Sequence, residues 1–112
     1  MIPELVLLAR KHINGLRLDN VEVMETDGSI GCRKEAPYDK AIITAACPDI
    51  PKAIIDQMKV GGIIVAPVGD MQQQTMIKAV KKEHGLDLEF LGSFTFVPMK
   101  GKYGFREAEV YY

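Results

Sequence analysis

Two short stretches of the sequence carry residue types that could form a small-molecule site, and the first contains Asp27 and Gly28. This pair follows residues 21–24, whose alternating apolar side chains predict a short strand. A carboxylate at the carboxyl end of a parallel strand can accept hydrogen bonds from a ribose or from an adenine amino group. Asp-Gly is also a common turn, because glycine readily adopts positive φ. Both interpretations stay open on spacing alone.

The second stretch is residues 36–48. Pro37 and Asp39 mark its start, an apolar run at residues 41–43 predicts a buried strand, and small side chains follow at residues 44–46. In an open α/β sheet, ligands bind in the crevice at the carboxyl ends of the strands. Small side chains there allow a ligand to approach the backbone. We therefore interpret this stretch as the floor of a binding site.

No residue stands out as a catalytic group or a metal ligand. His12 lies along the apolar side of a predicted helix, and His84 lies beside a turn glycine. Cys32 and Cys47 lack the C-x-x-C spacing and are too few for a disulfide scaffold, which is typical of reduced thiols in a cytoplasmic protein. The sequence therefore predicts neither a catalytic side chain nor a metal site.

Composition excludes several classes of function. The 112 residues predict one domain, and a net charge of −1 argues against a general nucleic-acid or membrane-surface binder. The short basic and aromatic stretch at residues 100–106 is a weak signal for nucleic-acid contact. No signal peptide is visible, and no stretch reaches the roughly 18 apolar residues of a membrane span. We expect a cytoplasmic protein without nucleic-acid or membrane partners.

The order of the predicted elements favours an α/β fold. Helices are predicted at residues 3–13 and 50–58, with Gly61 and Gly62 ending the second, and strands at residues 21–24, 41–43 and 63–66. Strand, helix and strand in succession are typical of a parallel βαβ unit. Residues 75–82 fit either a helix or a strand. Residues 86–90 and 94–97, separated by a break at Gly92, predict antiparallel strands that close the sheet.

Several short motifs occur in an order that resembles the protein-L-isoaspartate O-methyltransferases. They are Asp27-Gly28, residues 36–39, residues 43–46, Gly61-Gly62, Pro67-Val68-Gly69 and residues 96–99. Each motif is weak alone, and the order and spacing carry the resemblance. Residues 101–105 are most similar to archaeal members. The resemblance implies the Rossmann-like sheet of a class I S-adenosylmethionine-dependent methyltransferase, with residues 1–112 forming a single truncated domain.

The resemblance also implies a reaction and a set of site residues. Members of this family methylate the carboxylate of L-isoaspartyl residues, which begins the repair of damaged proteins. Four matched residues would contact S-adenosylmethionine: Asp27, Gly28, Thr44 and Ala45. Six would surround the substrate: Ala46, Pro67, Val68, Gly69, Val97 and Pro98. A carboxylate with a pKa near about 4 is already ionised at neutral pH, so the reaction needs alignment and exclusion of water rather than a general base.

The sequence departs from the family in what it lacks. There is no counterpart of the glycine-rich G-x-G-x-G loop, of the acidic residue that holds the ribose, or of the Ser/Thr segment that contacts the isoaspartyl group. The chain therefore resembles the carboxyl-terminal half of the enzyme, without the first two strands. In the family's sheet those strands lie between the ones predicted at residues 21–24 and 41–43. We expect these two strands to pair directly, or a second copy or a separate amino-terminal half to fill the gap.

Three functions remain open. The first is a methyltransferase polypeptide that acts on isoaspartyl proteins or peptides and is inactive without the missing amino-terminal half. The second is a catalytically dead interaction or assembly domain. The third is a small-ligand binder that keeps only the adenine side of the pocket.

Overall fold

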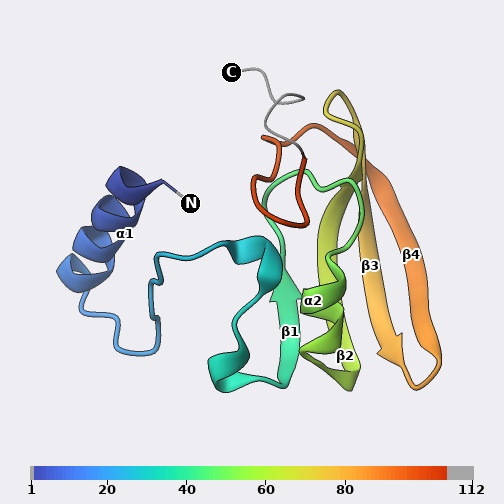
Figure 1. Cartoon of the computed structure of the whole chain (residues 1–112), viewed down its shortest axis with the longest axis horizontal. Helices are drawn as coiled ribbons and strands as arrows, with labels where there is room; N and C mark the ends of the chain where they lie inside the picture. Colours follow the sequence, from blue (N-terminus) through green and yellow to red (C-terminus); the bar gives the residue numbers. More distant parts are fainter. Residues whose placement is uncertain (1, 106–112) are drawn as a thin grey trace.

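A four-stranded sheet forms the centre of the computed structural model, which describes residues 2–105 (Figure 1). The longer helix α1 (Pro3–Gly15) stands apart from this sheet and is joined to it by an extended segment. The remaining elements are η1 (Gly28–Ile30), η2 (Arg33–Glu35), β1 (Tyr38–Ile42), α2 (Lys52–Asp56), β2 (Met58–Gly69), β3 (Gln74–Lys82) and β4 (Gly85–Phe94). None of the helices between residues 2 and 105 is long and apolar enough to cross a membrane.

The strands follow one another across the sheet in the order β1-β2-β3-β4. β1 runs parallel to β2, whereas β3 pairs antiparallel with both β2 and β4. The predicted strand-helix-strand unit and the antiparallel strands that close the sheet are therefore confirmed. Residues 75–82, which fitted either helix or strand, belong to β3. Their Thr, Ile and Val side chains suit a pleated, half-buried surface.

Alternation along the strands places the core on one face of the sheet. Ile64 of β2 lies opposite Ala79 of β3, and Ala66 lies opposite Ile77, and all four side chains are buried. Ile54 and Ile55 of α2 pack against this cluster, so the short helix covers that face. The rest of the buried cluster is Ile43, Cys47, Ile50 and Met58.

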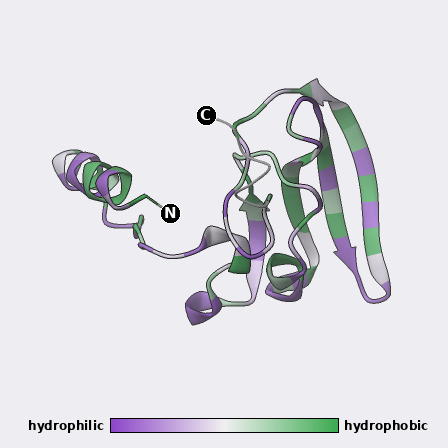
Figure 2. Ribbon diagram, turned by 45° about the horizontal axis from the view of Figure 1, so that its top comes forward, coloured by the Kyte–Doolittle hydropathy of each residue, from purple (hydrophilic) through white to green (hydrophobic). Residues whose placement is uncertain are grey.

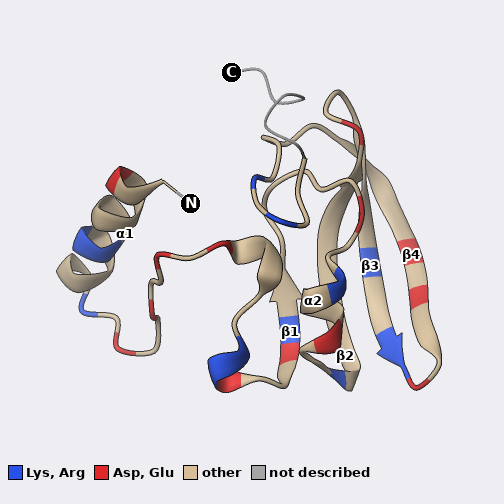
Figure 3. Cartoon of the chain, in the orientation of Figure 1, with Lys and Arg blue, Asp and Glu red and all other residues tan. Residues whose placement is uncertain are grey.

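Alternation continues to β4, although its side chains are more exposed. The hydropathy bands along β3 and β4 alternate in Figure 2, and β4 has no buried residue. Lys78 of β3 lies directly opposite Glu89 of β4, so opposite charges face each other across the hairpin (Figure 3). The hairpin therefore has a polar side as well as an apolar one.

The strand predicted at residues 21–24 is wrong, because this segment forms no strand. Instead of a strand partner, the backbone here contacts a side chain: the Val23 carbonyl accepts hydrogen bonds from Arg10 Nε at 3.4 Å and Nη2 at 3.3 Å. Val21 and Met24 stay exposed. Direct pairing of residues 21–24 with β1 is therefore also wrong. Alternation predicts a strand only if a neighbouring strand completes its backbone hydrogen bonds.

Gly61 and Gly62 do not end a helix, which corrects a second prediction. α2 ends at Asp56, and β2 begins at Met58 and continues through both glycines. The pairing of β1 with β2 is irregular here, since Tyr38 lies opposite Met58 while Lys40 lies opposite Ile63. Gly61 has a φ of +87°, a backbone conformation that glycine adopts without strain. The glycines therefore form a bulge that brings β2 back into register with β1.

The end of β4 also differs from the prediction. Gly92 does not interrupt the strand, because a second irregularity places Met76 opposite Gly92 and Ile77 opposite Phe90. Leu91 is the extra residue of this bulge. Residues 95–97 form no regular strand. They lead instead into the segment that returns across the carboxyl end of β1.

Candidate functional site

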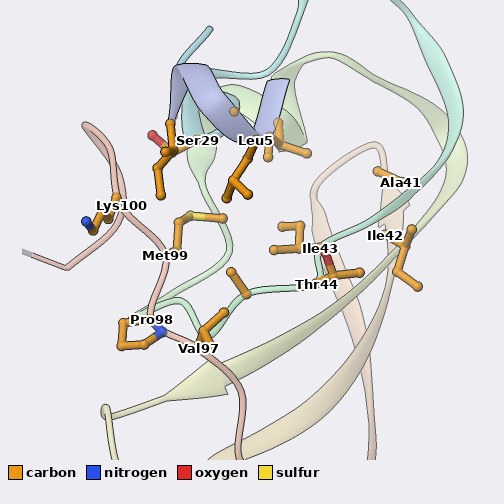
Figure 4. Close-up of a pocket in the computed structure, with 14 residues that line it drawn as sticks. Leu5, Ser29, Ala41, Ile42, Ile43, Thr44, Val97, Pro98, Met99 and Lys100 are labelled. Atoms are coloured by element: carbon orange, nitrogen blue, oxygen red, sulfur yellow. The ribbon is translucent and has the colours of Figure 1, made fainter. Parts of the chain in front are cut away.

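A pocket of about 560 Å³ lies beside the carboxyl end of β1 (Figure 4). Leu5 of α1 and Met99 project into it from different elements, and Ile43 and Thr44 form part of its floor. The full lining is Ile2, Leu5, Gly28, Ser29, Ala41, Ile42, Ile43, Thr44, Ala45, Ile54, Val97, Pro98, Met99 and Lys100. Lys100 is the only ionisable side chain among these described lining residues. The pocket therefore suits a largely apolar ligand with a few polar groups.

One wall of the pocket is a segment from the end of the described chain, residues 96–103, which we call the strap. It lies alongside residue 46, where the Ala46 N–H donates to the Val97 carbonyl at 2.7 Å and the Met99 N–H donates to the Ala46 carbonyl at 2.6 Å. Ala46 is completely buried. A small residue at this position lets the two backbones come together, which explains the cluster of small side chains after β1.

The end of β2 lies behind this floor. The Cys47 N–H donates to the Pro67 carbonyl at 2.9 Å, and the Gly69 N–H donates to the Cys47 carbonyl at 3.0 Å. Burial raises the pKa of the Cys47 thiol to about 11, and the nearby Asp49 carboxylate adds to the effect. Cys47 is therefore a neutral packing residue rather than a nucleophile.

The Asp27 carboxylate closes the far side of the pocket through its hydrogen bonds. Oδ1 accepts from the Ser29 N–H at 3.0 Å and from the Ser29 hydroxyl at 2.7 Å, and Oδ2 accepts from the Lys102 N–H at 2.8 Å. Partial burial by itself would raise the pKa of Asp27. The hydrogen bonds from Lys102 and Ser29 outweigh it and lower the pKa below its ordinary value.

The structure brings only some of the predicted site residues into this pocket. Gly28, Thr44, Ala45, Val97 and Pro98 line it. Asp27 adjoins it through Ser29, and Ala46 lies beneath its floor. Pro67, Val68 and Gly69 lie beside Cys47 and are not among the lining residues.

Sequence reasoning missed several residues that line the pocket: Ile2, Leu5, Ser29, Met99 and Lys100. Ser29 had a recognisable signal, because Asp-x-Ser at the start of a helical turn is a capping pattern. Leu5 belonged to the apolar stripe predicted for the first helix. Met99 belonged to the motif at residues 96–99 without being assigned a role, and Lys100 had no signal for the pocket, since the return of the strap to β1 depends on long-range packing.

No residue group in the described part of the chain has the composition of a metal site. The pocket itself offers backbone groups, the Thr44 hydroxyl, the Lys100 side chain and apolar walls, while the Ser29 hydroxyl is hydrogen-bonded to Asp27. Such a site can bind and orient a ligand and exclude water. It contains no paired acid and base for proton transfer.

One side of the pocket borders an incomplete edge of the sheet. Across residues 2–105, no strand pairs with the edge of β1 that faces away from β2. Ile42, at the end of β1, is 74% exposed. α1 contributes Leu5 to the pocket and yet has no buried residue. The elements around the pocket therefore carry apolar surface that nothing in the described chain covers.

Comparison with known proteins identifies a single family. The family model described as "Protein-L-isoaspartate(D-aspartate) O-methyltransferase (PCMT)" matches residues 1–104. The chain is 43% identical over 108 residues to "Protein-L-isoaspartate O-methyltransferase 1" of Archaeoglobus fulgidus, a match that covers 96% of this chain and 49% of that protein. The chain spans about half the length of the curated relatives it matches.

Solved structures share the fold. A protein-L-isoaspartate O-methyltransferase superimposes with a TM-score of 0.83 at 23% identity, covering 90% of this chain and 32% of that one. A putative protein-L-isoaspartate O-methyltransferase from Plasmodium falciparum, in complex with S-adenosyl-L-homocysteine, gives a TM-score of 0.74 at 19% identity. It covers 88% of this chain and 49% of that one. The four-stranded sheet is therefore part of a Rossmann-like methyltransferase fold.

Proposed function

The chain belongs to the protein-L-isoaspartate O-methyltransferase family, and on this premise we propose that residues 1–112 are one truncated domain, the carboxyl-terminal half of a cytoplasmic repair enzyme. The complete enzyme transfers a methyl group from S-adenosylmethionine to the carboxylate of L-isoaspartyl residues in proteins or peptides. This half is inactive until an amino-terminal half completes the site.

The observation that carries the proposal is the convergence of segments on one pocket. Gly28 and Ser29, the end of β1, and Val97 and Pro98 are far apart in the sequence and line the same space. These are segments that the family resemblance assigns to the cofactor and the substrate. An unrelated packing role would not require them to surround an opening of about 560 Å³.

The lining residues fit one part of S-adenosylmethionine. A Cβ added to Gly28 would meet no atom within 4 Å, so the glycine leaves open space at the pocket wall. A flat adenine ring fits such a space between apolar side chains, with the Thr44 hydroxyl at the pocket wall. When bound, the cofactor supplies an activated methyl group. Gly28, Thr44 and Ala45 remain the proposed cofactor contacts, whereas Asp27, the fourth residue of the predicted set, adjoins the pocket through Ser29.

Methyl transfer to a carboxylate requires the remaining residues to orient the substrate and exclude water. An isoaspartyl carboxylate is ionised at neutral pH, with a pKa near about 4, so it needs no base. Val97 and Pro98 are apolar residues at the pocket rim that can pack against the substrate peptide. Ala46, Pro67, Val68 and Gly69 would act from behind the floor, by fixing the position of the loop after β1. Alignment of this kind supplies much of the rate acceleration in reactions that join two bound groups.

The incomplete edge supports a separate partner half. Among the residues that the structure describes, nothing pairs with the outer edge of β1, Ile42 is exposed beside the pocket, and α1 has no buried residue. Free strand edges with apolar neighbours recruit further strands. The curated relatives contain about as much chain again as this protein matches. An amino-terminal half that adds strands to β1 would cover these surfaces and supply the missing glycine-rich loop.

Reconstitution tests the proposal. The part of the Archaeoglobus fulgidus relative that this chain does not match is produced separately and mixed with the chain at equal concentration. Transfer of labelled methyl groups to an isoaspartyl peptide is then measured, with the matching aspartyl peptide and each half alone as controls. We expect transfer from the mixture only. Equal activity from the chain alone would contradict the proposed dependence on a second half.

A catalytically dead assembly domain remains the second candidate, and the free β1 edge favours it equally. The same mixture separates the two. A stable complex with no methyl transfer, and with no binding of S-adenosylhomocysteine, would support an assembly role. Self-association of the chain in sedimentation measurements would identify a second copy as the partner.

A further inference from the structure

The Asp27 carboxylate accepts hydrogen bonds from other residues of the same chain. Although its position beside the pocket suggests a ligand contact, three of its acceptor positions are taken, by the Ser29 N–H, the Ser29 hydroxyl and the Lys102 N–H. The Ser29 hydroxyl oxygen in turn accepts from the Tyr103 N–H at 3.0 Å. Asp27 and Ser29 therefore hold two consecutive backbone amides of the strap, 75 and 74 residues away in the sequence. We call this arrangement the latch.

The glycine at the bend of the strap is required by the latch. Gly101 has a φ of +131°, which L-amino acids with a side chain rarely adopt. A Cβ at this position would collide with Asp27 Oδ1 and with the Ser29 hydroxyl. The close approach of the strap to Asp27 thus depends on the absence of a side chain at residue 101. The basic and aromatic sequence around it contributes its backbone to the latch.

The strap carries part of the pocket wall between two attachments. At one end, Val97 and Met99 hydrogen-bond to both sides of Ala46, and at the other end the latch holds Lys102 and Tyr103. Met99 and Lys100 line the pocket between these two points (Figure 4). Ser29 also lines the pocket and is 1% exposed. The position of this wall is therefore fixed by groups that lie at the edge of the pocket.

We propose that Asp27 is a positioning residue that acts on the pocket through the strap: with Ser29, it holds Lys102 and Tyr103 so that Met99 and Lys100 close the adenine side. This inference rests on the proposed function for the identity of the ligand, although the latch itself does not. Because coupling is reciprocal, a ligand held against Met99 also stabilises the latch. Asp27 then influences affinity without touching the ligand.

Amide hydrogen exchange on the isolated chain tests the latch. Asp27→Asn replaces one acceptor oxygen by a donor, and Gly101→Ala displaces the strap while leaving Asp27 in place. We expect exchange at Lys102 to become about 10- to 100-fold faster in both variants, as for loss of a hydrogen bond to a charged group. Exchange at Tyr103 should become faster as well, because the Ser29 hydroxyl that accepts from it is held by Asp27. Exchange at Ile43, which donates to Val65 in the sheet, should not change. Unchanged exchange at Lys102 and Tyr103 would overturn the latch.

Asp70→Asn is the matched control. Asp70 also accepts two backbone N–H groups, from Gln72 and Gln73 at 2.8 Å each, in the turn between β2 and β3. It lies outside the pocket lining. This variant should leave exchange at Lys102 and Tyr103 unchanged. Faster exchange throughout the chain in any variant would indicate global destabilisation, and would count against a local latch.

Binding of S-adenosylhomocysteine by the reconstituted halves separates action through the strap from direct contact. If Asp27 acts through the strap, Gly101→Ala weakens binding as much as Asp27→Asn, by about tenfold for one such hydrogen bond. If only Asp27→Asn weakens binding, Asp27 contacts the ligand directly and the proposal is wrong. If neither variant does, the strap does not position the pocket wall. Failure of the halves to assemble would contradict the proposed function, while the exchange experiment on the isolated chain would still decide whether the latch exists.

Discussion

Apolar residues on one face of the sheet are buried, whereas those of the first 26 residues of the chain stay largely exposed, although both regions have a regular apolar pattern. In the sheet, alternating residues such as Ile64 and Ala66 are completely buried. α1 has an apolar stripe of the predicted spacing, and yet Leu7 is 66% exposed and no residue of the helix is buried. The segment after α1 is held by exposed contacts, including the 3.2 Å ion pair between Glu22 and Lys34. The pattern predicts which surface a segment can bury, and a partner surface decides whether it does.

The two regions should differ most in how much stability is lost when a large apolar side chain is shortened to alanine. Ile64→Ala removes a completely buried side chain from the cluster against which Ile54 and Ile55 of α2 pack. We expect the free energy of unfolding to fall by about 2–5 kcal/mol, through lost burial and a residual cavity. Urea denaturation followed by circular dichroism measures the change. Leu7→Ala is the control, and should change stability by less than about 0.5 kcal/mol. A similar loss of stability in both variants would show that the helix side chain is packed as tightly as the core of the sheet.

Gln57 joins the start of β2 to residues 30–32, which follow the first region, and should give the next largest effect. Its Oε1 accepts from the Cys32 N–H at 2.8 Å, and its Nε2 donates to the Ile30 carbonyl at 2.9 Å, in a buried position. Gln57→Leu leaves both backbone groups without a partner, and should lower stability by about 2 kcal/mol. Thermal unfolding checks this expectation. The exposed Gln73 provides the control through Gln73→Leu, and an equal loss there would show that burial of the amide is not the cause.

The two thiols, Cys32 and Cys47, should differ in their rate of alkylation. Burial and Asp49 raise the pKa of Cys47 to about 11, from an ordinary value of 9.0. At pH 8 its thiolate is therefore about 100-fold rarer than that of an ordinary thiol, whereas Cys32 is partly exposed. Iodoacetamide should modify Cys32 first, as followed by mass spectrometry. Equal rates in the native protein would contradict the burial of Cys47.

The same thiol gives a pH dependence of stability. The raised pKa means that the folded state keeps the Cys47 proton when the unfolded chain has lost it. Its stabilising contribution is complete below about pH 9 and disappears as the pH rises toward about 11. A Cys47→Ala variant should lack this part of the decline in urea denaturation at high pH. An identical decline in both proteins would assign it to other groups.

The smallest effect on stability is expected at the end of β1. Ile42 is 74% exposed, so Ile42→Lys should change the free energy of unfolding of the isolated chain by less than about 0.5 kcal/mol. If the free edge of β1 binds a partner half, the same variant should weaken that association, as measured by sedimentation velocity. A large loss of stability in the isolated chain would show that Ile42 already packs against something.

The sequence predicted those parts of the fold that local pattern determines. The first helix, β1, the strand at residues 63–66 and the alternating residues of β4 follow from periodicity and turn residues, whereas residues 75–82 fitted either a helix or a strand. The strand at residues 21–24 failed because a strand requires a neighbour, and the glycines at 61 and 62 were mistaken for a helix end because a bulge depends on the register with β1. In the site, family resemblance located Gly28, Thr44 and Val97. The contributions of Met99 and Lys100 depend on the return of the strap, which no local pattern encodes.

The order of strands in the sheet has a consequence for how the chain folds. Each strand pairs with its neighbour in the sequence, so the sheet needs only short loop closures and can grow as the chain leaves the ribosome. The strap is different, since Lys102 must find Asp27 across 75 residues. The pocket should therefore form last. In refolding with pulsed hydrogen exchange, we expect the amide of Ile43 to become protected before that of Lys102, so that the pocket is completed only after the sheet has formed.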